Sequence, residues 1–482
     1  MALALLPAFG GAPLRTAAAA NPAAVAAGPW ASAWMGGDST VASVTMRDVR
    51  TMIGMGTGTT AAGLTGAGVG IALIDTGVAP VPGLTAGQIV NGPDLSFESQ
   101  SGALRYLDTY GHGTHMAGIM VGNGSTDADS VGLAPKAKLT SIKVGTASGA
   151  VDATQVMAAI DWVVQHRRDD PAYPIRVINL AYGAGGYPTH LTDPVMAAAE
   201  YAWRAGIVVV AAAGNGGHTK LANPAKDPFV IGVGSAATAG TATNADDTVS
   251  TFTSGIYQTI TFCVVAPGEG IVSLRDPGSS IDEAYPAARQ GDSLFRGSGT
   301  SQATAVTTAA VALLLQARPT LTPNDVKQVL VASASSIKDG RAMLNVNRAI
   351  ATPVPAYVPR TQYSTGDGLL DDSRGTSRVV SGGAALNGQR DIFGSFNAPA
   401  WAYQSFRGAA WQGGVWMGRR FAADGWTGTS WAARTWGPAA WTGTSWSGES
   451  WADPAWQGRY WSGRYWSGGP WEGRYWSSDD WG

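Results

Sequence analysis

Short runs of apolar and β-branched residues alternate with longer amphipathic stretches between about residues 68 and 351. Apolar runs of this length, bounded by glycine or polar residues, are typical of strands buried on both faces of a parallel sheet. Strands that alternate with helices in this way predict an α/β fold, with a doubly wound, mostly parallel sheet and helices on both faces. The predicted strands are 70–75, 138–144, 176–180, 207–211 and 229–233.

The predicted helices lie between and after these strands. Two of the stretches carry apolar side chains at i, i+3 and i+4, which is the spacing of an amphipathic helix. A third begins with threonine followed by proline, the signature of an N-cap and a first helical residue. The predicted helices are 112–121, 153–166, 193–205, 301–315 and one that starts at Thr322-Pro323.

An aromatic residue recurs at every fifth position near the C-terminal end of the sequence. The series runs from Phe396 to Trp481, and all eighteen positions hold Phe or Trp. Five residues advance an α-helix by about 140° net, and an odd period alternates between the two faces of a strand, so neither element gathers the rings on one side. Eighteen free rings would expose on the order of 3,000 Å², far more than a soluble monomer usually exposes in apolar patches. Unless this segment is disordered, the rings are expected to pack against the repeat itself, the rest of the chain or a partner.

Changes in composition divide the chain into four segments. Residues 1–40 are rich in alanine and begin with an apolar run, which resembles a signal-peptide core, although Arg15 follows the run instead of preceding it. Residues 41–352 hold the α/β pattern, 353–395 are interpreted as a linker, and 396–482 form the aromatic repeat. No apolar run reaches the roughly 18 residues that a membrane-spanning helix needs. This organisation predicts a protein that is secreted or associated with the cell envelope.

Charge and cysteine content argue against several classes of function. Lys plus Arg number 32 and Asp plus Glu number 34, and no basic block occurs, so the sequence lacks the electrostatic footprint of a nucleic-acid-binding protein. The single cysteine, Cys263, excludes an internal disulfide framework and a thiolate metal cluster, and is interpreted as a small buried apolar residue. No cofactor is predicted.

Three glycine-containing motifs carry residues that suit one reaction. Asp75 ends a predicted strand in Asp-Thr-Gly, His112 opens a predicted helix in Gly-His-Gly-Thr-His, and Ser301 opens another in Gly-Ser-Gly-Thr-Ser. A serine hydroxyl needs an adjacent base to become a nucleophile, and the base needs a third group to fix its tautomer. We therefore predict a catalytic triad in which Ser301 attacks, His112 moves the proton and Asp75 orients His112.

An amide side chain is expected to complete this site. Asn215 follows a predicted buried strand in the run Ala-Ala-Ala-Gly-Asn. Unpaired backbone amides at the start of the helix that Ser301 opens also favour developing negative charge. Asn215 and the backbone amide of Ser301 are therefore predicted to form the oxyanion hole.

These motifs resemble those of the subtilases, the subtilisin-like serine peptidases, over about residues 68–351. Asp75, His112, Asn215 and Ser301 match the family's Asp-Thr/Ser-Gly, Gly-His-Gly-Thr-His, Ala-Gly-Asn and Gly-Thr-Ser, in that order. The resemblance implies a subtilisin-like fold and a serine endopeptidase that hydrolyses peptide bonds through an acyl-enzyme. Similar tryptophan-rich tails occur on subtilases of high-GC bacteria. Subtilases often bind calcium, but no Asp-rich loop here has the spacing of a site, so no metal ligand is predicted and structural calcium stays open.

Two uncharged segments match the strands that bracket the substrate's P1 residue in that family. They are Ala181-Tyr182-Gly183 and Ala212-Ala213-Gly214. The resemblance implies that an extended peptide binds as an added strand, with broad specificity and an uncharged, mainly apolar P1 side chain.

The sequence departs from the family's pattern at two places. Alanine at 305 stands where the family has the proline of Gly-Thr-Ser-Met-Ala-x-Pro, which bears on the rigidity of the helix entry. The family's Asn-x-Ser-x-Gly is here Asn-Leu-Ala-Tyr-Gly, and Tyr182 in place of the usual leucine is expected to narrow or polarise the P1 pocket.

Two functions from different classes fit the sequence. The first is a serine endopeptidase that acts on protein or peptide substrates, with an aromatic repeat that contacts either the catalytic domain or the cell wall. The second is an envelope-anchored binding protein whose peptidase domain is vestigial. The complete triad and oxyanion donor favour the peptidase, and labelling with an organofluorophosphonate distinguishes the two because only a working nucleophile reacts.

Overall fold

The computed structural model describes residues 41–419, apart from 86, 101–103, 125–126, 150, 185–188, 239–240, 242, 257–262, 357–361, 376–379, 382–383 and 413–414. The predicted leader and the repeat positions after residue 419 lie outside the described residues. Within the described part of the chain, no helix combines the length and the apolar character that crossing a membrane requires.

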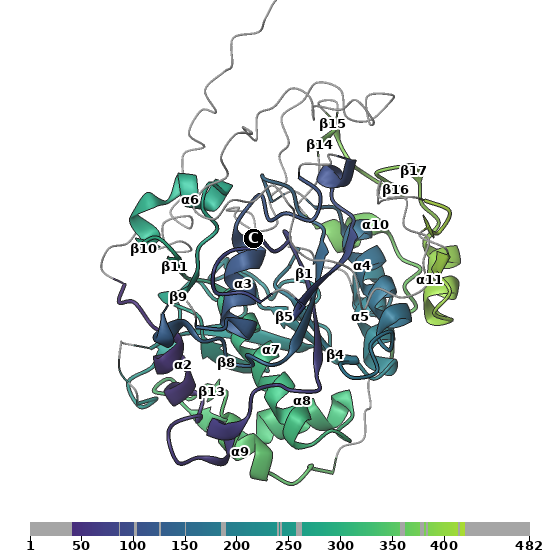
Figure 1. Cartoon of the computed structure of the whole chain (residues 1–482). Helices are drawn as coiled ribbons and strands as arrows, with labels where there is room; N and C mark the ends of the chain where they lie inside the picture. Colours follow the sequence, from purple (N-terminus) through teal and green to yellow (C-terminus); the bar gives the residue numbers. More distant parts are fainter. Residues whose placement is uncertain are drawn as a thin grey trace, which may run out of the picture.

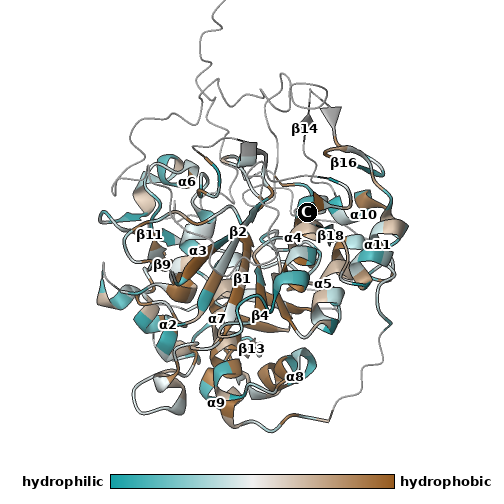
Figure 2. Cartoon of the chain, turned by 45° about the vertical axis from the view of Figure 1, so that its right-hand side comes forward, coloured by the Kyte–Doolittle hydropathy of each residue, from teal (hydrophilic) through white to brown (hydrophobic). Residues whose placement is uncertain are grey.

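A ten-stranded, mostly parallel sheet forms the centre of the domain (Figure 1). All residues of its central strands β1 and β5 are buried, which accounts for their apolar sequences. Figure 2 shows apolar residues concentrated in the middle of this sheet, around β1 and β4. In spatial order the strands are β12 (Ser335–Ser336), β13 (Ala342–Met343), β8 (Val264–Pro267), β6 (Ile231–Ala237), β5 (Val208–Ala212), β4 (Ile175–Leu180), β1 (Gly70–Asp75), β3 (Lys138–Lys143) and β2 (Ile89–Asp94), with β7 (Thr248–Val249) beside β6.

Helices cover both faces of the sheet, so the predicted α/β fold is confirmed. The helices α3 (His112–Val121) and α7 (Thr300–Ala317) pack against each other on one face, and every residue of α3 is buried. The helices α4 (Ala153–His166) and α5 (Pro194–Arg204) lie together on the other side of the sheet (Figure 1). The remaining α-helices of the described residues are α2 (Met46–Met52), α6 (Ser280–Ala284), α8 (Pro323–Ser333), α9 (Val346–Ala351), α10 (Leu370–Arg374) and α11 (Ala398–Phe406).

Within the described residues, four smaller sheets lie outside the central one. The three-stranded sheet is β10 (Arg289–Gln290), β11 (Leu294–Gly297) and β9 (Ile271–Leu274), and the two-stranded ones are β14 (Val380–Ser381) with β15 (Ala384–Ala385), β16 (Arg390–Asp391) with β17 (Gly394–Ser395), and β18 (Trp411–Gln412) with β19 (Val415–Trp416).

Side-chain caps fix the starts of α4 and α5. The carboxylate of Asp152 accepts from the backbone N–H of Thr154 and forms a capping box with Gln155, so α4 begins at residue 153 as predicted. Asp193 is the N-cap of α5, which begins at Pro194. The helix therefore starts one residue after the predicted start at residue 193.

The described helix α11 and strand β18 of the chain after residue 362 pack against α5 and α4. Arg374 is fully buried and forms an ion pair with Asp152, with Nε and Oδ1 2.7 Å apart. The indole N–H groups of Trp401 and Trp416 both donate to Oδ2 of Asp161 at 2.8 Å. Trp411 donates to the carbonyl of residue 158 in the same helix at 2.8 Å. The described start of the aromatic repeat therefore contacts the domain, whereas contacts of the later repeat positions or with a cell wall stay predictions.

Cys263 is only partly buried, whereas the sequence analysis interprets it as a buried apolar residue. Its Sγ lies 3.7 Å from the carbonyl oxygen of Val230, and the residue packs at the margin of the core.

Two buried carboxyl groups lie side by side where α5 meets the loop before β6. Glu200 and Asp227 are almost fully buried and are hydrogen-bonded to each other. Burial, together with the neighbouring Asp227 carboxylate, raises the pKa of Glu200 to about 9. Glu200 therefore keeps its proton at neutral pH and donates it to Asp227.

This pair makes stability depend on pH. Glu200 has a pKa of about 4.3 in an unfolded chain, so the folded protein binds the proton more tightly and loses this stabilisation as the pH rises through about 9. We expect Glu200→Gln, which keeps a donor toward Asp227, to reduce the fall in Tm between about pH 5 and pH 9. Exposed Glu283→Gln is the control and should leave the slope unchanged. Equal slopes in wild type and Glu200→Gln would contradict this assignment.

Candidate active site

The carboxyl ends of three neighbouring strands lie at one edge of the central sheet. Asp75 is the last residue of β1, Ala181 follows β4, and Ala213 follows β5. These strands are parallel and adjacent in the order β5, β4, β1. Ligands of open α/β sheets bind outside the carboxyl ends of the strands, so this edge is where a site is expected.

Asp75 and His112 form a buried pair at this edge. Nδ1 of His112 lies 2.8 Å from Oδ1 of Asp75, and each side chain is only 1% exposed. The backbone N–H of Thr76 also donates to Oδ1 at 2.7 Å. Burial raises the pKa of Asp75, while the adjacent His112 acts to lower it. The hydrogen bond places the proton on Nδ1 and makes Nε2 the basic nitrogen of the ring.

Ser301 is the second residue of α7 and is almost completely buried. Its Oγ lies 3.5 Å from the carbonyl oxygen of Ala181, which places it at the carboxyl end of β4. Gln302, the next residue along α7, lines the same small cavity as His112. The structure therefore brings Asp75, His112 and Ser301 to one edge of the sheet. Their catalytic roles stay predictions.

Asn215 lies beside the start of α7. Its Oδ1 accepts hydrogen bonds from the backbone N–H and the Oγ1 hydroxyl of Thr300, both at 2.9 Å. Since the oxygen end of the amide is engaged, the NH₂ end is the one that remains to donate. Thr300 directly precedes Ser301, so the half-buried Asn215 side chain lies next to the residue predicted to be the nucleophile.

The two predicted P1 segments are held next to each other. Ala211 of β5 pairs with Leu180 of β4, so both segments continue from neighbouring strands. The N–H of residue 222 donates to the carbonyl of Ala213 at 2.9 Å, and residues 184 and 223 exchange two hydrogen bonds at 3.0 Å. The six predicted substrate-binding positions, Ala181, Tyr182, Gly183, Ala212, Ala213 and Gly214, are all buried. Tyr182 belongs to the apolar core, and its predicted effect on the P1 pocket stays a prediction.

Asp108 supports the Asp75–His112 pair, although little in the sequence besides its position shortly before His112 points to that role. It is fully buried and accepts hydrogen bonds from the hydroxyls of Thr76 and Thr114, both at 2.7 Å. The backbone N–H groups of residues 110, 111 and 114 also donate to it. Asp108 thus ties the loop after β1 to the start of α3, which holds Asp75 and His112 in register.

Removing this carboxylate should disturb both stability and catalysis. We expect Asp108→Ala to cost about 3 kcal/mol of stability, because several buried donors lose their acceptor. kcat should fall by about tenfold or more, because the Asp75–His112 geometry loosens. Urea denaturation and peptide hydrolysis measure the two effects, and exposed Asp292→Ala is the control. A variant with wild-type stability and kcat would show that Asp108 does not position the pair.

His115 lies one turn after His112 but has a different environment. It is buried, and its Nε2 lies 3.1 Å from the carbonyl oxygen of Phe295. Burial, followed by the proximity of His112, lowers the pKa of His115 to about 4. The residue is therefore neutral at physiological pH and suits packing. Among the described residues, no group of three or more His, Cys, Asp or Glu side chains could hold a metal ion.

The buried Asp75–His112 pair and Ser301, at the start of α7, lie at the same end of the parallel sheet. The family model described as the subtilase family matches residues 66–368, and the chain belongs to this family. Relatives named as a serine protease and as subtilisins place this family among the serine peptidases.

Named relatives show how far the similarity extends. Serine protease AprX of Bacillus subtilis (strain 168) is 37% identical over 284 residues, which cover 57% of this chain and 63% of AprX. Subtilisin DY of Bacillus licheniformis is 32% identical over 297 residues, which cover 60% of this chain and 93% of that protein. The chain thus spans less than two thirds of AprX.

A solved structure shares the fold. A protease from Pseudoalteromonas arctica aligns with a TM-score of 0.50 and 23% identity, over 63% of this chain and 96% of that one. The segment after residue 368, including α10 and α11, lies beyond the region that the family model matches.

Proposed function

We propose that the protein is a secreted serine endopeptidase that uses Asp75, His112 and Ser301 as its catalytic triad. The observation that carries the proposal is the buried hydrogen bond between Asp75 and Nδ1 of His112, at the same sheet edge as Ser301. Secretion is supported by a relative named as a minor extracellular protease, Epr of Bacillus subtilis (strain 168).

The proposed mechanism gives each of these groups one role. Oγ of Ser301 attacks the carbonyl carbon of the scissile bond while Nε2 of His112 takes the hydroxyl proton. His112 then gives this proton to the leaving amine, and the peptide C–N bond breaks to leave an acyl-enzyme. Water, deprotonated by His112, attacks the ester and restores Ser301. Asp75 holds the imidazole in the required tautomer and stabilises the imidazolium that forms twice in each cycle.

The oxyanion of each tetrahedral intermediate needs donors at a fixed place. The NH₂ group of Asn215 and the backbone N–H of Ser301 would supply them, because Thr300 holds the other end of the Asn215 amide. These donors act mainly in the transition state, since the carbonyl oxygen becomes charged only there.

Substitution of Asn215 tests this role. We expect Asn215→Leu to lower kcat by about 10²–10³-fold with little change in KM, because one oxyanion donor is lost. The magnitude is carried over from subtilisin, a member of the same family. Asn387 is exposed and lies in the segment beyond the matched domain. Asn387→Leu should therefore be measured alongside and should retain kcat within about twofold. A drop in KM and kcat together, or no drop in kcat, would argue against an oxyanion role.

The two segments predicted to bracket the P1 side chain of the substrate, 181–183 and 212–214, are the basis for a proposed substrate preference. With no charged side chain among the six positions, we propose an extended substrate with an uncharged, mainly apolar P1 residue. Hydrolysis of casein by the full chain tests the peptidase activity, and a peptide library with every residue at P1 tests the preference. Cleavage confined to Lys, Arg, Asp or Glu at P1 would refute the preference. A folded protein that cleaves nothing would refute the peptidase.

A further inference from the structure

Two consecutive residues, Ala222 and Asn223, connect the two segments that are predicted to bracket the P1 side chain. The backbone N–H of Ala222 donates to the carbonyl of Ala213 in the second segment at 2.9 Å. Asn223 exchanges two backbone hydrogen bonds of 3.0 Å with Ala184, the residue that follows the first segment. The position of Asn223 therefore helps to set the spacing of both segments.

A buried carboxylate holds the side chain of Asn223. Nδ2 of Asn223 donates to Oδ2 of Asp193 at 2.7 Å, and both residues are at most 1% exposed. Within the described residues, Oδ1 of Asn223 has no hydrogen-bond partner, so the bond to Asp193 orients this amide. Asp193 is also the N-cap of α5, where its Oδ1 accepts from the backbone N–H of Met196 at 2.9 Å. Asp193 thus fixes Asn223 relative to the helix.

The same carboxylate binds a serine from the C-terminal part of the chain. Oγ of Ser373 in α10 donates to Oδ1 of Asp193 at 3.0 Å and accepts from the backbone N–H of Val195 at 3.3 Å. Ser373 is fully buried, and it lies beyond residue 368, where the match to the family model ends. A chain of hydrogen bonds therefore runs from Ser373 through Asp193 and Asn223 to the two P1 segments.

The loop just ahead of Asp193 is held by the same part of the chain. The backbone N–H of Thr365 donates to the carbonyl of Leu191 at 2.8 Å, and that of Gly368 donates to the carbonyl of Thr192 at 2.9 Å. A β-carbon on Gly368 would lie 2.6 Å from the carbonyl oxygen of Thr192, so glycine is what allows this close approach. The two backbone segments thus fit closely together.

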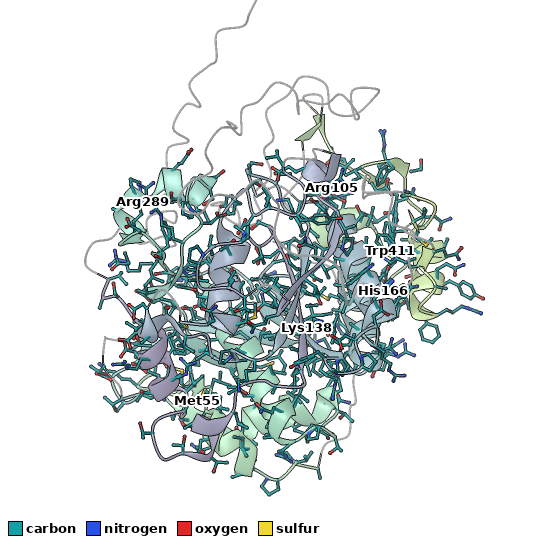
Figure 3. All side chains as sticks on the ribbon, viewed as in Figure 1. Met55, Arg105, Lys138, His166, Arg289 and Trp411 are labelled. Atoms are coloured by element: carbon teal, nitrogen blue, oxygen red, sulfur yellow. The ribbon has the colours of Figure 1, made fainter. Side chains whose placement is uncertain are left out.

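α10 is in turn fixed to the rest of the domain. Its last residue, Arg374, is fully buried and forms an ion pair with Asp152, the N-cap of α4. Further along the chain, Nε2 of Gln165 in α4 donates to the carbonyl of Trp411 at 3.0 Å, and Figure 3 labels Trp411 near His166 of the same helix. A serine on an anchored helix holds its partner in one position.

We propose that Ser373 is a positioning residue for substrate specificity, which acts through Asp193 and Asn223 to fix the spacing of the two P1 segments. This inference rests on the proposed peptidase function. An apolar pocket discriminates between side chains by close fit, so it discriminates only as sharply as its walls are held in place. Without the Ser373 hydroxyl, Asp193 and Asn223 are held less firmly and the walls separate more easily. The triad itself does not depend on this contact.

The test measures P1 preference in variants of the full chain. The substrates are peptide p-nitroanilides that differ only at P1, with alanine, valine, leucine or phenylalanine there. We expect Ser373→Ala to reduce the spread of kcat/KM between the best and the worst of these substrates by about fivefold, mainly through a higher KM for the best one. The rate at which a small fluorophosphonate without a peptide labels Ser301 should stay within about twofold, because this reagent does not need the P1 pocket.

Ser405→Ala is the matched control. Ser405 is another buried serine of the C-terminal part of the chain, and it donates to a buried helix carboxylate, Asp161 of α4. The other described donors to Asp161 are the indoles of Trp401 and Trp416, so this carboxylate has no described hydrogen bond to either P1 segment. Both serine variants should lose a similar amount of stability in urea, whereas only Ser373→Ala should change P1 preference.

A second variant keeps the test decisive if Ser373→Ala does not fold. Asn223→Ala breaks the same chain of hydrogen bonds at its other end and should reduce the spread to a similar degree, with no further reduction in the double variant. Circular dichroism shows which variants are folded. An unchanged spread in folded Ser373→Ala or Asn223→Ala, or an equal reduction in Ser405→Ala, overturns this inference alone. A folded wild type that takes up no label and cleaves no peptide overturns the proposed function, and this inference with it.

Discussion

Replacement of Ser301 by alanine is expected to lower kcat for peptide hydrolysis by about 10⁶-fold while the protein stays folded. The substitution removes the nucleophile, and the remaining imidazole and oxyanion donors have no hydroxyl to activate. The magnitude is the one known for the equivalent change in subtilisin, a member of the same family. Ser301 lies at the start of the long, buried α7, where alanine is a good helix former, so little loss of stability is expected.

The matched control lies in the same motif. Ser298 is also fully buried, and its Oγ accepts from the backbone N–H of Gly270 at 2.9 Å. Ser298→Ala should therefore lower stability by about 1 kcal/mol but keep kcat within about tenfold. Single-turnover hydrolysis of a chromogenic peptide measures both variants. If Ser301→Ala kept more than about one hundredth of the wild-type rate, another group would have to be the nucleophile.

Asp75→Asn is expected to lower kcat by about 10⁴-fold with a small change in KM. The carboxylate accepts the Nδ1 proton of His112, whereas an amide that turns its NH₂ toward the ring would leave Nδ1 as the acceptor. The proton then resides on Nε2, which can no longer take the proton from Ser301. The magnitude comes from a triad in an unrelated serine protease fold, since the roles of the three groups are the same.

The same substitution at an exposed aspartate is the control for this test. Asp292→Asn, an exposed change of the same chemistry, should retain the wild-type kcat. Circular dichroism and Tm show whether the Asp75→Asn protein is folded. A loss of kcat smaller than about tenfold in folded protein would mean that Asp75 does not set the tautomer of His112.

The sequence predicted the elements whose burial is uniform. β1 is apolar up to its last residue, Asp75, and both α3 and α4 have clear starts, so their predicted bounds coincide with those of the structure. β2 was not predicted, because Ile-Val-Asn-Gly-Pro-Asp contains polar and turn-forming residues although the structure buries all six. Here the pairing of β2 with β3 outweighs local propensity.

The supporting contacts of the site could not be predicted in the same way. Asp108 accepts a hydrogen bond from Thr76, which lies 32 residues earlier in the chain. Asp161 accepts a hydrogen bond from the indole of Trp401, which lies 240 residues later. Such partners are set by the tertiary fold and leave no periodic signal in the sequence. The motif residues Asp75, His112, Asn215 and Ser301 could be proposed from the sequence because each lies at, or a few residues from, the end of an element with a strong pattern of its own.

The most direct test of the account is to label the purified full chain with a fluorophosphonate and to map the adduct by mass spectrometry. The account predicts one adduct, on the peptide that contains Ser301, and no labelling of Ser301→Ala. It also predicts that casein hydrolysis stops in proportion to the labelling. A folded wild-type protein that takes up no label, or that is labelled at another serine, would contradict the proposed triad and would favour a binding protein with a vestigial peptidase domain.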